Sequence, residues 1–185
     1  MINEVLSEAK KAMDKSVEAL TSDLAALRTG RASTGLVNKL LVEYYGTPTM
    51  LQELALVSIP EPHLIAIRPY DPGALKHIER AIMQSDLGLT PNNDGKIIRL
   101  QVPALTEERR RSLVKTAAKR VEEARVSVRN TRREKLEDLR EFEKEKMISE
   151  DDFYSGRDQL QKLTDDYIKK IDEIGVSKEK EILEV

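Results

Sequence analysis

Residues 6–30, LSEAKKAMDKSVEALTSDLAALRTG, decide the fold because apolar side chains recur in them at a fixed interval. The positions seven residues apart are Leu6, Met13, Leu20 and Leu27, and those between them are Ile2, Ala9, Ser16 or Val17, and Leu24. This 3-4 repeat is typical of a helix that buries a narrow stripe in a bundle or coiled coil. It predicts a long helix capped by Gly30, with Arg28 near its negative end.

Two further segments carry the same kind of stripe. In the last one the apolar positions are Phe153, Leu160, Tyr167 and Ile174, with Leu163 and Ile171 alongside. Ser149 and Asp152 are spaced as a capping box at its start. The segment from Thr106, a plausible N-cap, to about Lys144 has its stripe at Leu113 or Val114, Ala117, Val121, Ala124, Val128, Leu136, Leu139 and Phe142. The three stripes predict an antiparallel, coiled-coil-like three-helix bundle.

The segment between the first two helices has a different composition. All seven prolines lie from Pro48 to Pro103. Short β-type runs occupy 39–45, 55–59, 63–67 and 96–102, and a helix is expected from Pro72–Gly73 to Met83. The sequence therefore predicts an α+β protein of two domains. Residues 1–29 plus 106–185 form the bundle, 31–104 form a small α+β domain, and the junctions fall near 29–31 and 103–106.

Bulk composition excludes several classes of protein. Charged residues make up 35% and aromatic residues 4% of the 185, and the net charge is −2. Cysteine is absent, which removes disulfides, thiolate nucleophiles and cysteine-ligated zinc. Acidic residues in the first ten positions do not fit a signal peptide, and no apolar run is long enough to span a membrane. We expect a cytoplasmic protein without membrane contact.

No motif in the chain predicts catalysis. Residues 30–35, GRASTG, have the glycine spacing of a phosphate-binding loop, but Leu36 and Val37 stand where lysine and serine or threonine are needed. The two histidines, His63 and His77, form no close ligand pair and are interpreted as ordinary surface or partly buried residues. We therefore predict no catalytic residue, no metal site and no cofactor.

The helix predicted from Thr106 to about Lys144 carries an unusual concentration of positive charge. From Arg109 to Arg133 there are ten lysines and arginines against two acids, whereas residues 134–152 contain four bases and nine acids. Four of these arginines share one helix face through i, i+4, i+7 and i+8 spacing, namely Arg125, Arg129, Arg132 and Arg133. We call these four residues the arginine face.

Two interpretations of the arginine face remain open. It is a solvated surface paired with acids of neighbouring helices, as charge runs usually are. Alternatively, it binds a polyanion, because arginine suits bidentate contact with phosphate. Arg28 and Arg31 beside Gly30 would add to such a surface. Few aromatic residues argue against base stacking, so folded RNA or a duplex backbone fits better than single strands.

The chain resembles the ribosome recycling factor family over its full length. The matching segments are LRTGRAS (27–33), VEYYGTP (42–48), SDLGL (85–89), LTEERR (105–110), ARVSVRNTRRE (124–134) and ISEDD (148–152). The resemblance implies a three-helix bundle and a small β/α/β domain joined by two hinge strands, with an L-shaped, tRNA-like outline. The hinge residues would be Thr29, Gly30, Pro103, Ala104 and Leu105.

The resemblance also implies a function and its residues. Family members bind the post-termination ribosome between its subunits, with the bundle along large-subunit rRNA, and hydrolyse nothing themselves. Elongation factor G, using GTP, then drives subunit separation and release of mRNA and tRNA. Arg132 matches the family's critical arginine, and Arg129, Arg133, Arg125, Arg28 and Arg31 are assigned to rRNA contact. Arg109 and Arg110, placed at the second hinge strand, are weaker candidates.

Two rival interpretations predict different behaviour. A coiled-coil adaptor would use the apolar repeats to dimerise, whereas we expect a monomer. An enzyme built on the inserted domain would place Asp71 or His63 in a pocket.

Overall fold

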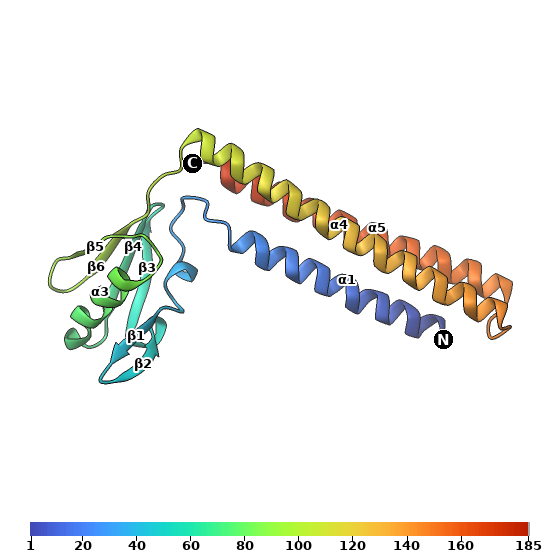
Figure 1. Cartoon of the computed structure of the whole chain (residues 1–185), viewed down its shortest axis with the longest axis horizontal. Coiled ribbons are helices and arrows are strands. Elements are labelled where there is room, and N and C mark those ends of the chain that lie inside the picture. The colour runs from blue at the N-terminus through green and yellow to red at the C-terminus, as the bar shows by residue number, and fades with distance from the viewer. Residues whose placement is uncertain (185) are drawn as a thin grey trace. The chain divides into compact units, whose positions relative to one another are not determined.

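The computed structural model, which describes residues 1–184, divides into two compact units (Figure 1). The first, here called the bundle unit, comprises Met1–Thr29 and Glu107–Glu184. The second, the small unit, comprises Gly30–Thr106. These limits put Thr106 in the small unit, one residue away from its predicted place, and the last residue of the predicted range 106–185 lies outside the described residues.

Three long helices make up the bundle unit: α1 (Ile2–Ala25), α4 (Glu107–Lys144) and α5 (Glu150–Leu183). Side-chain pairs fix their directions. Ser16 meets Ser127 and Glu8 meets Lys135, so α1 runs antiparallel to α4. Arg125 meets Asp172 and Arg132 meets Gln161, so α5 is also antiparallel to α4. With 38 residues, α4 extends about 57 Å at 1.5 Å per residue.

Most of the predicted stripe positions lie in the bundle core. Met13 and Leu20 of α1, Val128 and Leu139 of α4, and Ile171 of α5 are at most 2% exposed. The outer repeat positions Leu6, Leu27 and Ile174 are only partly buried because they lie at the margins of the contact. The bundle fold and its stripes are therefore as the sequence predicts.

The start of α5 also follows the sequence. Ser149 Oγ accepts from the Asp152 amide at 3.1 Å, and the Asp152 carboxylate accepts from the Ser149 amide at 3.3 Å. This reciprocal pair is a capping box, which satisfies two backbone donors at the helix N-terminus.

The end of α1 differs from the prediction. The helix stops at Ala25, five residues before Gly30, and its last turn contains no basic residue. Gly30 does take a positive φ of 78°, but as part of the chain leaving the bundle unit and not as a helix cap. Arg28 therefore does not compensate the helix dipole, whose effect is confined to the last turn.

The small unit contains two antiparallel sheets. A hairpin pairs β1 (Leu41–Tyr44) with β2 (Thr47–Met50). The larger sheet has the strand order β3 (Ala55–Glu61), β4 (Leu64–Pro69), β6 (Ile98–Gln101), β5 (Pro91–Asn93). The helices are α3 (Leu75–Gln84), the single turn α2 (Leu51–Leu54) and two 3₁₀ turns at Thr34–Leu36 and Pro72–Ala74.

Strands β2 and β5 are not predicted from the sequence because each contains a proline. Pro48 reads as the end of a strand, yet Tyr45 and Gly46 have φ of 49° and 78°, which suits a two-residue hairpin turn of type I′. Pro91 begins β5 at the outer edge of the larger sheet, where a missing amide donor is tolerated.

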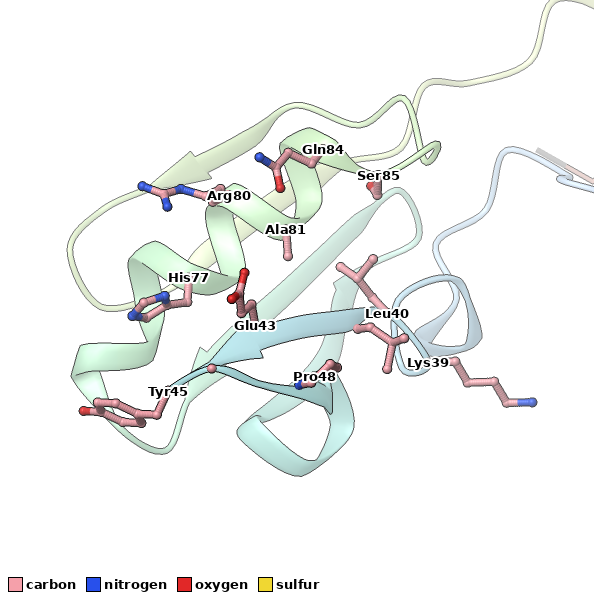
Figure 2. A pocket seen from close by; sticks show the side chains of 12 residues that line it. Lys39, Leu40, Glu43, Tyr45, Pro48, His77, Arg80, Ala81, Gln84 and Ser85 are labelled. Atoms are coloured by element: carbon pink, nitrogen blue, oxygen red, sulfur yellow. The ribbon is translucent and has the colours of Figure 1, made fainter.

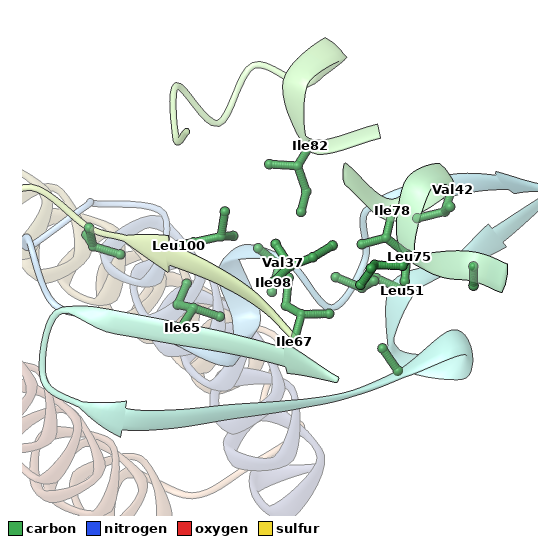
Figure 3. Close-up of a cluster of buried hydrophobic side chains, with 13 residues drawn as sticks. Val37, Val42, Leu51, Ile65, Ile67, Leu75, Ile78, Ile82, Ile98 and Leu100 are labelled. Carbon is green, nitrogen blue, oxygen red and sulfur yellow. The ribbon is translucent and has the colours of Figure 1, made fainter. Parts of the chain in front are cut away.

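The small unit has its own apolar core between the larger sheet and α3 (Figure 3). Ile65 and Ile67 of β4 lie near Ile98 and Leu100 of β6, and Ile78 of α3 joins the same cluster. All five are fully buried. Among the described residues, each unit therefore has its own buried core, which contains no side chain of the other unit.

Tyr167 of α5 donates a hydrogen bond to Asp14 of α1, and this contact makes the stability of the bundle unit pH-dependent in the alkaline range. Burial, and then its hydrogen bond to the Asp14 carboxylate, raise the pKa of Tyr167 from 10 to about 12. A raised pKa means that the protonated phenol stabilises the folded state fully below pH 10 and loses that effect as the pH approaches 12. We expect Tyr167→Phe to lower the free energy of unfolding by about 1 kcal/mol at pH 8, because the hydrogen bond to Asp14 is lost.

The difference in unfolding free energy between the two chains should shrink as the pH rises from 10 to 12. In this range the Tyr167 phenol ionises in the unfolded wild-type chain while it stays largely protonated in the folded one, so the wild-type chain loses stability that Tyr167→Phe does not have. Urea melts of both chains, followed by circular dichroism, measure the difference. A gap that is constant from pH 8 to pH 12 would contradict this account of Tyr167.

Candidate nucleic-acid interface

The four members of the arginine face lie along α4 but differ in their surroundings. Arg125 is the most enclosed by acids. Its side chain is 30% exposed and donates to Asp172 of α5 at 2.6 and 2.7 Å and to Glu122 at 2.8 Å. These contacts raise the pKa of Arg125, with Glu122 as the larger cause. The Arg125 bond in turn lowers the pKa of Glu122, so both groups are charged at neutral pH.

Arg132 is held against α5 and is only partly exposed. Its Nη1 donates to the Gln161 side chain, and Gln161 donates to Asp165 at 2.8 Å. The Nε atom of Arg132 is buried and has no acceptor within residues 1–184. Gln161 thus orients the guanidinium without neutralising it, because the amide is uncharged.

Arg129 and Arg133 lie further out on α4. Arg129 is half exposed and approaches Glu122 at 3.5 Å. Arg133 is exposed, and the structure gives it no hydrogen bond or ion pair with any described residue. The four arginines therefore range from Arg125, which is ion-paired within the protein, to Arg133, which is exposed and has no ion pair with a described residue.

Lys115 and Lys119 belong to the same outward surface, although they are not among the residues predicted to contact rRNA. They precede Arg129 and Arg133 by 10 to 18 residues, and the spacings from Lys115 to the other three are near whole helical turns. Both lysines are exposed and unpaired in the part of the chain described. We call Lys115, Lys119, Arg129 and Arg133 the outer cationic row. An 18-residue spacing, five turns, could have revealed it.

Arg28 and Arg31 lie outside the helices of the bundle unit. Arg28 follows the last residue of α1, Ala25, by three residues. Arg31 belongs to the small unit. Both are exposed.

Arg109 and Arg110 are helical and not part of the second connecting strand. Both lie in the first turn of α4, after Glu107 and Glu108. Arg109 is exposed, whereas Arg110 is half-buried with its Nε enclosed. Arg110 is therefore the weaker candidate for an external contact.

The five predicted hinge residues lie at or near the two places where the chain passes from one unit to the other. Thr29 is buried in the bundle unit, and its hydroxyl donates to Glu181 at 3.3 Å. Gly30 packs closely on the second connecting segment: a Cβ at Gly30 would lie 3.0 Å from Leu105 Cγ and 3.5 Å from the Pro103 oxygen. Ala104 is exposed between these two. Only glycine combines this approach with the observed positive φ.

A hollow of about 870 Å³ lies in the small unit between β1 and α3 (Figure 2). His77, Glu43 and Arg80 line it, with Tyr45 at its rim. Asp71 and His63, the residues that an enzyme of this domain would use, do not. Asp71 instead accepts from Tyr44 at 2.6 Å, and His63 contacts a backbone carbonyl. Nothing in residues 1–184 forms a cluster able to hold a metal ion.

Comparison with known proteins decides the family. The model of the family described as ribosome recycling factor matches residues 20–183. The chain belongs to the ribosome recycling factor family. It is 52% identical to the ribosome-recycling factor of Geobacillus kaustophilus and 53% identical to that of Chloroflexus aggregans, each over all 185 residues and the whole of the relative.

Solved structures of ribosome recycling factors support the fold. A solution structure is 45% identical, with a TM-score of 0.79, and the match covers 100% of this chain and 98% of that one. A second structure holds models of the T. thermophilus ribosome recycling factor and the E. coli elongation factor G bound to the E. coli post-termination complex. Its matching chain is 44% identical, with a TM-score of 0.66 over 99% of both chains.

No helix among residues 1–184 combines the length and apolar character that crossing a bilayer requires.

Proposed function

We propose that this chain, as a ribosome recycling factor, binds large-subunit rRNA through α4 and, with elongation factor G and GTP, splits post-termination ribosomes into subunits. mRNA and tRNA are then free for a new round of translation. The chain carries out no chemistry itself, and it acts in the cytoplasm. The relative seen with elongation factor G on a post-termination complex supports the choice of partners.

The observation that carries the RNA assignment is the outer cationic row. Its four side chains extend over 18 residues of one rigid helix, about 27 Å, and three of them have no partner in the part of the chain described. Cations aligned along one face of a helix match a phosphate backbone, which presents fixed negative charges. Arg132 adds a guanidinium oriented by Gln161, so it needs little reorganisation to meet a phosphate.

The acids beside the arginine face limit which arginines contribute. Arg125 already has two carboxylate partners, Glu122 and Asp172, within 2.8 Å. Contact between Arg125 and phosphate would compete with these acids. We therefore assign rRNA contact to Arg129, Arg132 and Arg133 first, and to Arg125, Arg28 and Arg31 second.

A monomer fits the bundle better than a coiled-coil adaptor. The apolar positions of α1, α4 and α5 are covered by one another, with Met13, Leu139 and Ile171 fully buried. Among residues 1–184 no complete apolar stripe is left on the three helices for a second chain. The adaptor predicted from the repeats alone would need one.

The proposal is tested by light scattering of post-termination ribosomes mixed with the chain, elongation factor G and GTP. We expect splitting to require both factors. Arg132→Ala and Arg133→Ala should each raise the concentration needed for half-maximal splitting about 10–100-fold, because a charge-assisted contact is lost. Lys11→Ala removes an exposed, unpaired cation of α1 and serves as the matched control.

Normal splitting by the Arg133→Ala chain would contradict the assignment of the outer cationic row. Because Arg133 has no partner in the described structure, its removal leaves the fold intact. Absence of splitting by the unaltered chain, beside a working control factor, would reject the recycling function itself.

A further inference from the structure

The turn between β3 and β4, at Pro62–His63, contacts both segments that connect the two units. His63 Nδ1 lies 2.8 Å from the Gly30 carbonyl oxygen, and the Pro62 oxygen accepts from the Ala32 amide at 2.8 Å. The His63 oxygen accepts from the Val102 amide at 2.7 Å. We propose that His63 is a positioning residue that fastens both connecting segments to the small unit and so confines articulation to a few backbone torsions.

The partner of the His63 side chain in this hydrogen bond is a backbone carbonyl, that of Gly30. A carbonyl only accepts, so Nδ1 has to carry the hydrogen and donate to Gly30. The contact therefore selects the Nδ1–H tautomer of the neutral ring. No cofactor, metal or substrate role is needed to explain why a histidine stands here.

On the first segment, the residue before Gly30 is held by the opposite unit. Thr29 is 6% exposed, and its hydroxyl donates to Glu181 of α5. Lys178, with only 10% of its side chain exposed, lies 3.4 Å from the same carboxylate and keeps it in place. Thr29 is thus anchored to the bundle unit, while the Gly30 carbonyl is anchored to the small unit.

Two adjacent residues with opposite anchors leave very few free torsions. Between the Thr29 side chain and the Gly30 carbonyl lie only ψ of Thr29 and φ and ψ of Gly30. Glycine tolerates a wide range of both angles, so this point can turn with little steric cost. The first pivot therefore consists of three backbone torsions, ψ of Thr29 and φ and ψ of Gly30.

The second segment is limited in a similar way. The Val102 amide is bonded to His63, and Leu105 packs against Gly30. Since α4 begins at Glu107, a single residue, Thr106, separates the packed Leu105 from the helix. Loss of the His63 side-chain bond would move the small-unit anchor of the first segment from the Gly30 carbonyl to the Ala32 amide, which donates to the Pro62 oxygen.

Pulsed electron resonance distances between two spin labels test the proposal. The chain has no cysteine, so labels at Glu137→Cys in α4 and Gln84→Cys in α3, both exposed positions, are unambiguous. In His63→Ala the loss of one hydrogen bond should raise the population of displaced orientations roughly fivefold, seen as a broader distance distribution. His63→Asn places an amide donor near the Nδ1 position and should restore the narrow distribution.

Two further variants keep the test decisive. His77→Ala alters the small unit's other histidine, which does not contact a connecting segment, and should leave the distribution unchanged. Thr29→Val removes the bundle-side anchor without touching the small unit, and it should broaden the distribution even if His63→Ala does not fold. An unchanged width in Thr29→Val, or in a folded His63→Ala, would overturn the proposal.

The importance of this restraint for ribosome splitting rests on the proposed function, but the distance measurement does not. A broadened distribution together with undisturbed splitting would retain His63 as a positioning residue of the fold and overturn its importance in recycling. Failure of the unaltered chain to split ribosomes would reject the proposed function and leave the distance result standing.

Discussion

The affinity of this chain for ribosomes is expected to fall roughly 10²–10³-fold when monovalent salt is raised fourfold. Each phosphate neutralised by a cation releases about one counterion, so log K falls with log salt by about 0.9 per contact. Four to six contacts, from the outer cationic row with Arg132 and Arg28, give a slope of about −4 to −5. Co-sedimentation with ribosomes from 50 to 200 mM salt, as an order-of-magnitude range, measures it.

Single substitutions should change the slope according to each residue's surroundings. Arg133→Ala and Lys119→Ala, whose side chains are unpaired in the described structure, should each make the slope about one unit less steep. Arg125→Ala should change it little, since Glu122 and Asp172 already neutralise that guanidinium. A flat salt dependence in the unaltered chain, or equal effects at 125 and 133, would reject phosphate contact by the outer cationic row.

The sequence predicts the position of each arginine on its own helix but not its partner on another. Helical spacing correctly put 125, 129, 132 and 133 near one another. It could not show that Asp172, 47 residues away, lies opposite Arg125, or that Gln161 holds Arg132. The helix register that brings these pairs together follows from packing of three apolar stripes, which local patterns do not specify.

The same limit applies to the connecting segments. Proline distribution predicts junctions near 29–31 and 103–106, and the structure divides at Thr29–Gly30 and Thr106–Glu107. Gly30, however, was interpreted as a helix cap, whereas α1 ends at Ala25 and Gly30 is required by its close approach to Leu105. His63 seemed unremarkable in sequence because its partner, a carbonyl 33 residues earlier, carries no sequence signal.

Ile67→Ala should destabilise the small unit by about 2–5 kcal/mol and leave the bundle unit folded. Ile67 lies in β4 between Val57 and Ile98, with its side chain fully buried in the small unit's core. Truncation removes the burial of three carbons and leaves a cavity that the paired strands cannot close. For a unit of 77 residues this loss is comparable with its whole stability.

Hydrogen exchange followed by mass spectrometry separates the two units in one experiment. Peptides from β4, β6 and α3 should lose protection in Ile67→Ala, while those from α4 and α5 keep it. Leu56→Ala, in the neighbouring strand and 56% exposed, is the matched control and should change protection little. Simultaneous loss of protection in α4 would show that the units fold as one. The proposed function places binding in α4 and requires both units for splitting. It therefore predicts that Ile67→Ala, with its bundle unit intact, still binds ribosomes in a salt-dependent manner and yet fails to split them.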